Sequence, residues 1–280
     1  MKKIILLGDI SKKKIRETIT RLEPLFRKKS HLSVINISDE DALINVTADL
    51  VFVFGGDGTI LSASRKLYNK QIPLIGVHLG KFGFLAELTL QDINDSLERI
   101  CSGEYVISQR MLLTCKVIRS NQVIHETVGL NDAVISRTSL SRLISIKLYV
   151  NEKRVATYSC DGLIVSTPAG TTAHSLSAGG PIVTPDMEAF AITPICPHTL
   201  SNRPLVVSGS SKIEMEQISE SKGVGLTVDG QVYFDVKAGD RVVIEKADKK
   251  LQLIDTQTRT FYDVLREKLN WRGQPAYDVN

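Results

Sequence analysis

The sequence predicts an α/β N-terminal domain with a parallel sheet, followed by a mainly β, β-sandwich-like C-terminal domain. Up to about residue 100, strand-type and helix-type segments alternate, which is typical of a parallel sheet flanked by helices. Beyond Gly103 the pattern changes to short β-type runs separated by turn-forming residues. A chain of 280 residues also lies near the upper limit for one hydrophobic core, which favours two domains.

The first domain is expected at 1–103. Its strands are short apolar runs, expected at 3–7, 33–37, 50–54 and 72–77. Its helices have apolar residues three and four positions apart, and we expect them at 11–26, 60–70 and 93–103. The last helix follows a cap-like pair, Thr89 and Asp92. Ligands bind beyond the carboxyl ends of the strands in such sheets, so the loops at those ends are candidate site loops.

The second domain is expected at 104–257 and consists of β-type runs joined by tight turns. The expected strands are 111–119, 123–128, 133–137, 143–150, 155–158, 163–166, 225–228, 231–236 and 241–245. Turn formers such as Asp229-Gly230 separate many of them, as in hairpins. A helix at about 258–275 is expected to pack back on the first domain. Because no linker separates the domains, we expect a close interface with a cleft.

Bulk composition excludes several classes of protein. The net charge of +4 is small, and the basic runs at 12–14 and 27–29 are typical of a solvated helix face, so no nucleic-acid partner is expected. Four cysteines at irregular spacings predict reduced thiols and a cytoplasmic location. The five histidines form no zinc pattern, so no protein metal site is expected. No apolar run of about 18 residues occurs, so no membrane partner is expected either.

The most informative segment is a buried strand that runs into a glycine turn carrying a carboxylate. Five apolar residues, Leu50–Phe54, precede Gly55-Gly56-Asp57-Gly58-Thr59, and a helical pattern follows. Glycines allow a sharp turn and close approach of a ligand, and N–H groups at a helix start attract phosphate. A carboxylate there repels phosphate unless it meets a metal ion or a reacting hydroxyl. The turn therefore indicates phosphoryl transfer, although Gly-Asp-Gly can also be a plain turn.

Two further segments are candidate ligand contacts. Residues 76–85 form a second glycine-spaced loop after a strand. Residues 161–181 are dense in glycine, serine and threonine, and they comprise a strand, a turn and a short helix that Thr171 or Thr172 can cap. Small side chains let a ligand approach the backbone, and hydroxyl groups can bind a ribose or an amide. The apolar residues within this segment favour a binding role over a plain surface loop.

The order and spacing of these motifs resemble the NAD kinase family over nearly the whole chain. The matching segments are 55–59, 76–85, 131–132, 161–181 and 229–231. Diacylglycerol and sphingosine kinases share the glycine–aspartate turn, and phosphofructokinases share it loosely, whereas the long serine, threonine and glycine segment is far more specific to the NAD kinases. The resemblance implies transfer of the γ-phosphoryl group of ATP, or of polyphosphate, to the 2′-hydroxyl of the adenosine ribose of NAD, giving NADP. It also implies a homo-oligomer, a dimer or a tetramer.

The resemblance implies roles for individual residues as well. Asp57 matches the aspartate that accepts the hydroxyl proton. Backbone groups of Gly56, Gly58 and Thr59 would hold the triphosphate, and a divalent cation, Mg²⁺, would bind with the nucleotide. The residues implied to contact the dinucleotide are Asn131, Asp132, Arg142, Asp161, Ala169, Thr172, Ala173, His174, Ser175, Leu176, Ser177 and Gln231.

Five positions depart from the residues usual in the family. His78 stands where Asn is usual, Asp132 where Glu is usual, and His174 where Tyr is commonest. Ala169 and Thr171 replace Thr and Ser. These changes put fine contacts in question, because His174 is smaller than tyrosine and can titrate.

Two other functions stay open from the sequence. A lipid kinase of the same superfamily would need an apolar groove or a membrane-facing surface, and it would leave 161–181 unexplained. A non-catalytic sensor of NAD(H) would have no use for Asp57 in the phosphate turn. The chain contains no Walker sequence and no clean G-x-G-x-x-G pattern, which argues against a Rossmann dehydrogenase.

Overall fold

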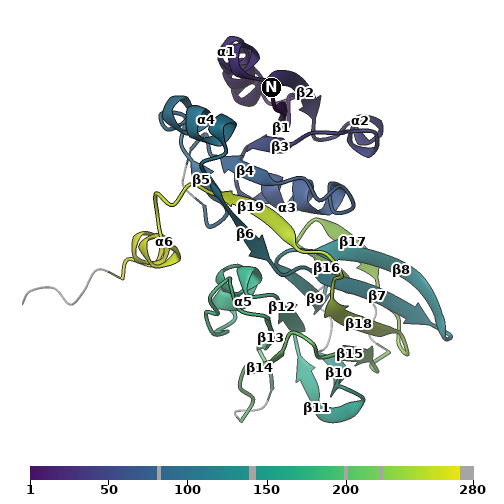
Figure 1. Ribbon diagram of the computed structural model, residues 1–280. Coiled ribbons are helices and arrows are strands. Elements are labelled where there is room, and N and C mark those ends of the chain that lie inside the picture. Colours follow the sequence, from purple (N-terminus) through teal and green to yellow (C-terminus); the bar gives the residue numbers. More distant parts are fainter. Residues whose placement is uncertain (81–82, 139–142, 199–200, 221–222, 272–280) are drawn as a thin grey trace, which may run out of the picture.

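The computed structural model describes residues 1–80, 83–138, 143–198, 201–220 and 223–271. In this part of the chain, a seven-stranded sheet with helices on both faces lies beside a pair of six-stranded antiparallel sheets (Figure 1). The expected fold class is therefore confirmed. No helix in the described ranges is long and apolar enough to cross a membrane.

The seven-stranded sheet has the order β2-β1-β3-β4-β19-β6, with β5 beside β4. Its strands are β1 (Lys3–Gly8), β2 (His31–Asn36), β3 (Leu50–Phe54), β4 (Leu74–Val77), β5 (Ala86–Leu88), β6 (Val106–Arg110) and β19 (Leu251–Asp255). The pairs are parallel except that β6 runs antiparallel to β19. All five residues of β3 are buried, as expected for a parallel strand covered on both faces.

Helices cover both faces of this sheet because successive strand residues point to opposite sides. Ile4 and Leu6 belong to one apolar cluster with residues of α1 (Lys13–Lys29) and α4 (Ile93–Ser102). Ile5 and Leu7 belong to another with residues of α2 (Glu40–Ile44) and α3 (Asp57–Lys66). The sheet thus holds the start of α3 at the carboxyl end of β3, where the glycine turn lies.

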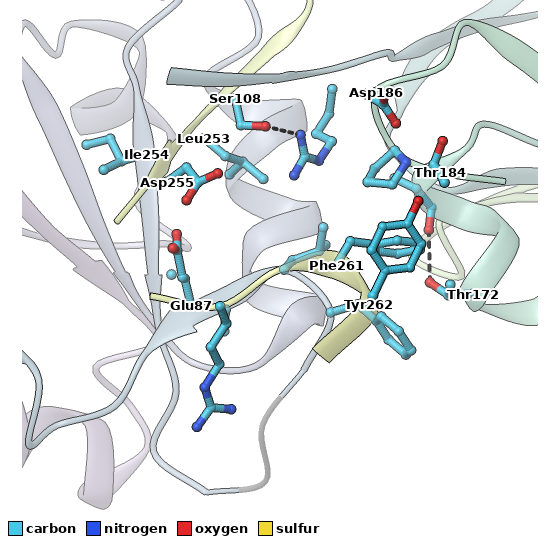
Figure 2. A pocket seen from close by; sticks show the side chains of 18 residues that line it. Glu87, Ser108, Thr172, Thr184, Asp186, Leu253, Ile254, Asp255, Phe261 and Tyr262 are labelled. Atoms are coloured by element: carbon cyan, nitrogen blue, oxygen red, sulfur yellow. Dashed lines mark hydrogen bonds between the residues drawn. The ribbon is translucent and has the colours of Figure 1, made fainter. Parts of the chain in front are cut away.

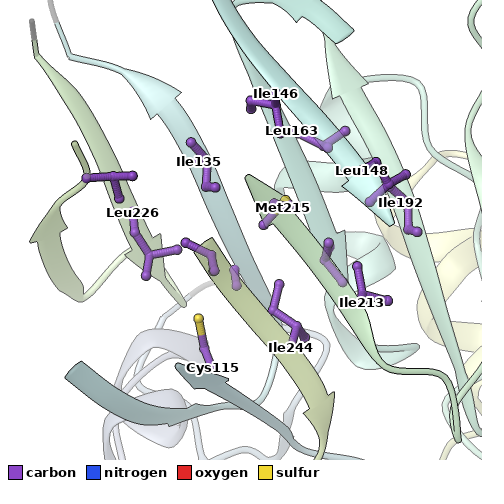
Figure 3. Packing of buried hydrophobic residues seen from close by; sticks show 14 of the residues in the cluster. Cys115, Ile135, Ile146, Leu148, Leu163, Ile192, Ile213, Met215, Leu226 and Ile244 are labelled. Carbon is purple, nitrogen blue, oxygen red and sulfur yellow. The ribbon is translucent and has the colours of Figure 1, made fainter. Parts of the chain in front are cut away.

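The other two sheets pack face to face as a β-sandwich. Their orders are β11-β10-β15-β18-β7-β8 and β14-β13-β12-β9-β16-β17. The strands are β7 (Leu113–Arg119), β8 (Gln122–Gly129), β9 (Asp132–Arg137), β10 (Ile144–Val150), β11 (Lys153–Cys160), β12 (Gly162–Ser166), β13 (Ala189–Ile195), β14 (Leu205–Ser208), β15 (Ile213–Gln217), β16 (Val224–Val228), β17 (Val232–Asp235) and β18 (Arg241–Lys246). Inward side chains of both sheets, such as Met215 and Leu226, share one core (Figure 3).

Three short helices complete the described chain. A 3₁₀ turn, η1 (Ala169–Thr172), and α5 (His174–Ser177) follow β12. The last helix, α6 (Phe261–Lys268), begins at a capping box in which Thr260 and Asp263 exchange hydrogen bonds with each other's backbone. It is shorter than the helix expected at about 258–275, part of which falls on residues 272–280, outside the described residues.

The domain limits 1–103 and 104–257 stay a prediction, and the sheet pairing refines them. β6 and β19 lie within the expected second domain in sequence, yet both pair into the first sheet, with Arg110 opposite Leu251. The chain therefore leaves the first sheet along β6, builds the sandwich, and returns along the neighbouring strand.

Candidate active site

Asp57 is the first residue of α3 and lies directly beyond the buried strand β3. Its Oδ2 accepts the N–H of Phe84 at 2.8 Å, and its Oδ1 accepts the N–H groups of Leu85 at 3.1 Å and Ala86 at 3.4 Å. The side chain is half-buried and forms no salt bridge with a described residue. The three N–H donors fix its orientation, while Oδ2, with one such bond, keeps capacity to accept a hydroxyl proton.

The second glycine loop therefore orients the carboxylate of the first. A Cβ atom on Gly83 would lie 2.0 Å from Asp57 Oδ1, so only glycine lets this loop approach the carboxylate. In the glycine turn itself, the N–H of Thr59 donates to the Gly56 carbonyl at 2.9 Å. Of the three expected phosphate donors, Gly56 and Gly58 are exposed to solvent, which leaves them better placed than Thr59.

Asn131 and Asp132 are held in place by a carboxylate from another strand pair. Oδ1 of Asp229 accepts the N–H of Asn131 at 2.7 Å and that of Asp132 at 3.2 Å, and Oδ2 accepts that of Leu130 at 2.9 Å. Burial, and then the charge of Asp229, raise the pKa of Asp132 to about 7. Asp132 therefore carries little charge below neutral pH, despite being a carboxylic acid.

The 161–181 segment packs against the Asn131 backbone. The N–H of Thr167 donates to the Asn131 carbonyl at 2.9 Å, and a Cβ on Gly170 would lie 1.9 Å from that oxygen. This contact places η1 and α5 beside Asn131. Thr172 and Ala173 are half-buried there, and His174 and Ser177 are exposed.

A cavity of about 360 Å³ separates the first sheet from the sandwich. It is lined from the first sheet by residues 84–87, from the sandwich by Ala169 and Thr172, and at its side by α6. Figure 2 shows Glu87 and Asp255 together at one end and Thr172, Thr184 and Tyr262 at the other. The loop that holds Asp57 and the segment expected to hold the dinucleotide therefore face one cleft.

The cleft has charged groups of both signs with perturbed acidity. Burial raises the pKa of Glu87 to about 7, and its Oε1 accepts the N–H and the hydroxyl of Thr256. Burial lowers the pKa of Arg110, whose side chain donates to Ser108. Perturbed groups in a cleft are typical of functional sites.

The structure does not bring every expected residue to this cleft. Arg142 lies outside the described residues. Asp161 precedes β12 and pairs with Arg137 at 2.9 Å, at the end of the strand opposite to Thr167. Six residues of strand span about 20 Å, so Asp161 of the same chain lies away from the cleft. Ser175 is fully buried and shares a hydrogen bond with Thr193 at 2.9 Å, which indicates a packing role.

Sequence reasoning did not assign a site role to Glu87 and Arg110, which line the cleft, or to Arg65 and Asp229, which lie outside its lining. Glu87 lies in the middle of the short strand β5 and Arg110 at the end of β6, and a polar residue in such a strand normally indicates a solvent-facing side chain. Arg65 falls within the helix expected at 60–70, and Asp229 falls in an expected hairpin turn within the matching segment 229–231. The roles of these residues depend on partners far away in the sequence, so no local sequence pattern predicts them.

Comparisons with known proteins identify the family of the chain. Residues 7–105 match the model of the ATP-NAD kinase N-terminal domain, and residues 130–256 match that of the ATP-NAD kinase C-terminal domain. The chain belongs to the ATP-NAD kinase family. A curated NAD kinase of Desulforamulus reducens is 41% identical over 276 residues, covering 95% of each chain. An NAD kinase of Geobacter sulfurreducens is 46% identical over 228 residues, covering 81% of this chain and 80% of its own.

Solved structures of the family have the same architecture. A yeast NADH kinase complexed with NADH superimposes with a TM-score of 0.84 at 25% identity, covering 99% of this chain and 90% of its own. The fold of an Archaeoglobus fulgidus NAD kinase in complex with ATP also matches, with a TM-score of 0.78 at 24% identity over 97% of this chain and all of that one. The enzyme class expected from the sequence, a phosphotransferase acting on NAD, is that of the family.

Proposed function

We propose that the protein transfers the γ-phosphoryl group of ATP to the 2′-hydroxyl of the adenosine ribose of NAD, giving NADP, and that Asp57 accepts the hydroxyl proton. In such a transfer the protein mainly aligns the reactants and neutralises charge. The backbone N–H groups of the exposed residues Gly56 and Gly58, at the N-terminus of α3, are suited to hold phosphate. Thr172, Ala173 and the exposed side chains of α5 are suited to hold the dinucleotide across the cleft.

The position of Asp57 carries this proposal. The three N–H groups that bind its carboxylate belong to Phe84, Leu85 and Ala86, and these same residues line the cleft on the side facing Ala169 and Thr172. A carboxylate at the N-terminus of a helix, facing the segment proposed to bind the ribose, is suited to act as a general base for a sugar hydroxyl. Such placement contributes about 10²- to 10⁴-fold to the rate.

A divalent cation, Mg²⁺, is proposed to enter with the nucleotide. The described residues contain no group of three or more His, Cys, Asp or Glu side chains able to hold a metal ion. Mg²⁺ in kinases binds substrate phosphates with one or two protein carboxylates, so the ion is proposed to be carried by the triphosphate. Asp57 is the carboxylate nearest to the proposed phosphate site, and the bound ion would screen it from the phosphate charge.

Three further properties belong to the same proposal. ATP is proposed as the donor, with polyphosphate as the second candidate. A dimer or tetramer of this chain is proposed from the family resemblance. A cytoplasmic location is supported by the four cysteines, Cys101, Cys115, Cys160 and Cys196, all of which are free thiols.

One assay tests the activity. The purified protein is incubated with NAD, ATP and Mg²⁺, and NADP is quantified with an NADP-specific dehydrogenase. Formation of NADP supports the proposal. Binding of NAD without turnover, with either ATP or polyphosphate, would instead indicate a sensor, and phosphorylation of diacylglycerol but not NAD would indicate a lipid kinase.

A further inference from the structure

Arg65, in the last turn of α3, connects the two halves of the site. Its Nη2 donates to Oε1 of Gln231 at 2.7 Å, and its Nη1 lies 3.6 Å from Oδ2 of Asp229. Gln231 in turn donates from Nε2 to the Gly58 carbonyl at 2.6 Å. Arg65, in the first of the two units (the seven-stranded sheet with its helices, and the sandwich), thus contacts the turn between β16 and β17. Gln231 of that turn contacts Gly58 in the glycine turn at 55–58, which we call the phosphate turn.

The same hairpin turn also holds Asn131 and Asp132, on the side of the cleft where the dinucleotide is proposed to bind. Asp229 and Gly230 have φ angles of +53° and +62°, as a type I′ turn requires, and Gln231 N–H donates to the Val228 carbonyl at 3.0 Å. The carboxylate of Asp229 binds the N–H groups of Leu130, Asn131 and Asp132. A continuous series of contacts therefore runs from Gly58 through Gln231, Arg65 and Asp229 to Asn131.

A guanidinium group suits the Arg65 position in this series of contacts, because one side chain there contacts both Gln231 and Asp229. The Asp229 side chain is completely buried, and Arg65 is its ion-pair partner at 18% exposure. A buried carboxylate without a counter-charge is strongly destabilising. The planar fork of arginine reaches Gln231 with one nitrogen and Asp229 with another, whereas lysine offers a single point of charge.

The geometry also suggests that the contact is not optimised for stability alone. Nη1 of Arg65 is buried, yet it has no hydrogen-bond partner within the described residues, because its distance of 3.6 Å to Oδ2 of Asp229 is too long for a hydrogen bond. By contrast, Arg119 binds Asp240 with two bonds of 2.8 and 2.7 Å in the sandwich. Arg65 accepts a poorer pairing at the place where it joins the two units.

We propose that Arg65 is a positioning residue: it fixes the phosphate turn, 55–58, relative to Asn131 and Asp132, and so sets the distance between phosphoryl donor and acceptor hydroxyl. The inference rests on the proposed function, because donor and acceptor are assigned there to opposite sides of the cleft. A misplacement of about 1 Å between reacting groups can cost about 100-fold in rate, so a residue that sets their register acts on turnover more than on binding.

The test compares Arg65→Lys with Arg119→Lys. Both variants keep the charge and lose the fork, and both face a buried aspartate, but only Arg65 joins the two units. For Arg65→Lys we expect kcat to fall by about 10- to 100-fold, with the Kd of NAD, measured by calorimetry, within about threefold of wild type. Arg119→Lys is expected to lower Tm while leaving kcat unchanged.

A second variant keeps the proposal testable if Arg65→Lys does not fold. Gln231 is exposed, so Gln231→Ala is expected to fold, and it breaks the link between Arg65 and Gly58. Its kcat should fall in the same direction, and the double variant should be no worse than the worse single variant, because both cut one series. Additive losses would contradict the proposal.

A readout without catalysis separates this inference from the proposed function. Hydrogen exchange of a peptide covering Leu130–Asp132 should become faster in Arg65→Lys and stay unchanged in Arg119→Lys, because Asp229 then holds those N–H groups less firmly. If wild type made no NADP, the proposed function would fail, and exchange would still decide whether the series exists. Unchanged exchange, or an unchanged kcat in Arg65→Lys, overturns the positioning role.

Discussion

Asp57 has two roles that a substitution can separate: it holds the backbone at 84–86, and it is the proposed proton acceptor. In Asp57→Asn the amide oxygen can still accept the N–H of Leu85, but the amide nitrogen cannot accept that of Phe84. We expect kcat to fall by about 10²- to 10⁴-fold while NAD binding is retained. Steady-state kinetics and calorimetry on the same sample measure both quantities.

The control for that substitution removes a similar charge elsewhere in the first unit. Asp92 precedes α4 and accepts the N–H and the hydroxyl of Thr89, so Asp92→Asn alters one helix start and leaves the cleft intact. Its kcat should match wild type. Turnover near wild type in Asp57→Asn would eliminate Asp57 as the base.

Gly83 tests whether the second glycine loop supports the first. In Gly83→Ala the new Cβ would lie 2.0 Å from Asp57 Oδ1, so either the loop or the carboxylate must move. We expect a loss of about 1–3 kcal/mol in the free energy of unfolding, typical of an overpacked site, and a lower kcat. Gly80→Ala in the same loop is the matched control, because no described atom lies within 4 Å of its added Cβ. Equal behaviour of the two variants in urea unfolding and kinetics would contradict this role.

At the level of single residues, the sequence predicts a group when its neighbours in the chain carry the signal. Asp57 is found because glycines surround it and a buried strand precedes it. Arg65 is not found, because its partners Gln231 and Asp229 are more than 160 residues away, and an arginine in a last helical turn already has a local explanation in the helix dipole. Ser175 looks like a ligand contact in sequence, but Thr193 from the next strand binds it.

Between elements, Glu87 ties β5 to the connection between β19 and α6. Burial raises its pKa from the ordinary 4.5 to about 7. Between those pH values the folded chain keeps a proton that the unfolded chain has lost, so the free energy of unfolding falls as pH rises through this window. Glu87→Gln keeps the acceptor for Thr256 and removes the titration. We therefore expect Tm of the variant, relative to wild type, to increase from pH 4.5 to 7.5.

Glu188 provides a control of opposite sign. Hydrogen bonds from Lys246 and then Lys250 lower the pKa of Glu188 to about 2, so its contribution to stability is complete above pH 4.5 and is lost only at lower pH. Glu188→Gln should therefore shift Tm by a constant amount between pH 4.5 and 7.5. A Tm difference for Glu87→Gln that does not change with pH would show that Glu87 is ionised in the folded protein throughout.

Elements were predictable where burial leaves a local pattern. The five buried residues of β3 and the alternating residues of the sandwich strands carry their own periodicity. β6 was not predicted: its residues are mostly exposed, and its place in the first sheet depends on β19, which follows about 140 residues later. Such pairing is decided by the whole fold, so the sequence predicts the fold class better than it predicts the domain limits.

For the molecule as a whole, the two units are joined by apolar packing as well as by Arg65. Leu130 is fully buried and belongs to the cluster that includes Ile60 and Leu61 of α3, whereas Leu226 is buried in the core of the sandwich. Leu130→Ala and Leu226→Ala should each lower the free energy of unfolding by about 2–5 kcal/mol, measured in urea at 25 °C. Only the first leaves its cavity at the junction between α3 and Asn131.

The two leucines therefore separate stability from alignment. At a temperature where both variants are folded, Leu130→Ala should lose turnover, because the cavity lets the phosphate turn shift relative to the dinucleotide side, and Leu226→Ala should keep it. Combining Leu130→Ala with Arg65→Lys should give less than the product of the two losses in kcat, since both loosen the same junction. If both leucine variants kept the turnover of wild type, rigid contact between the units would not be what aligns the substrates.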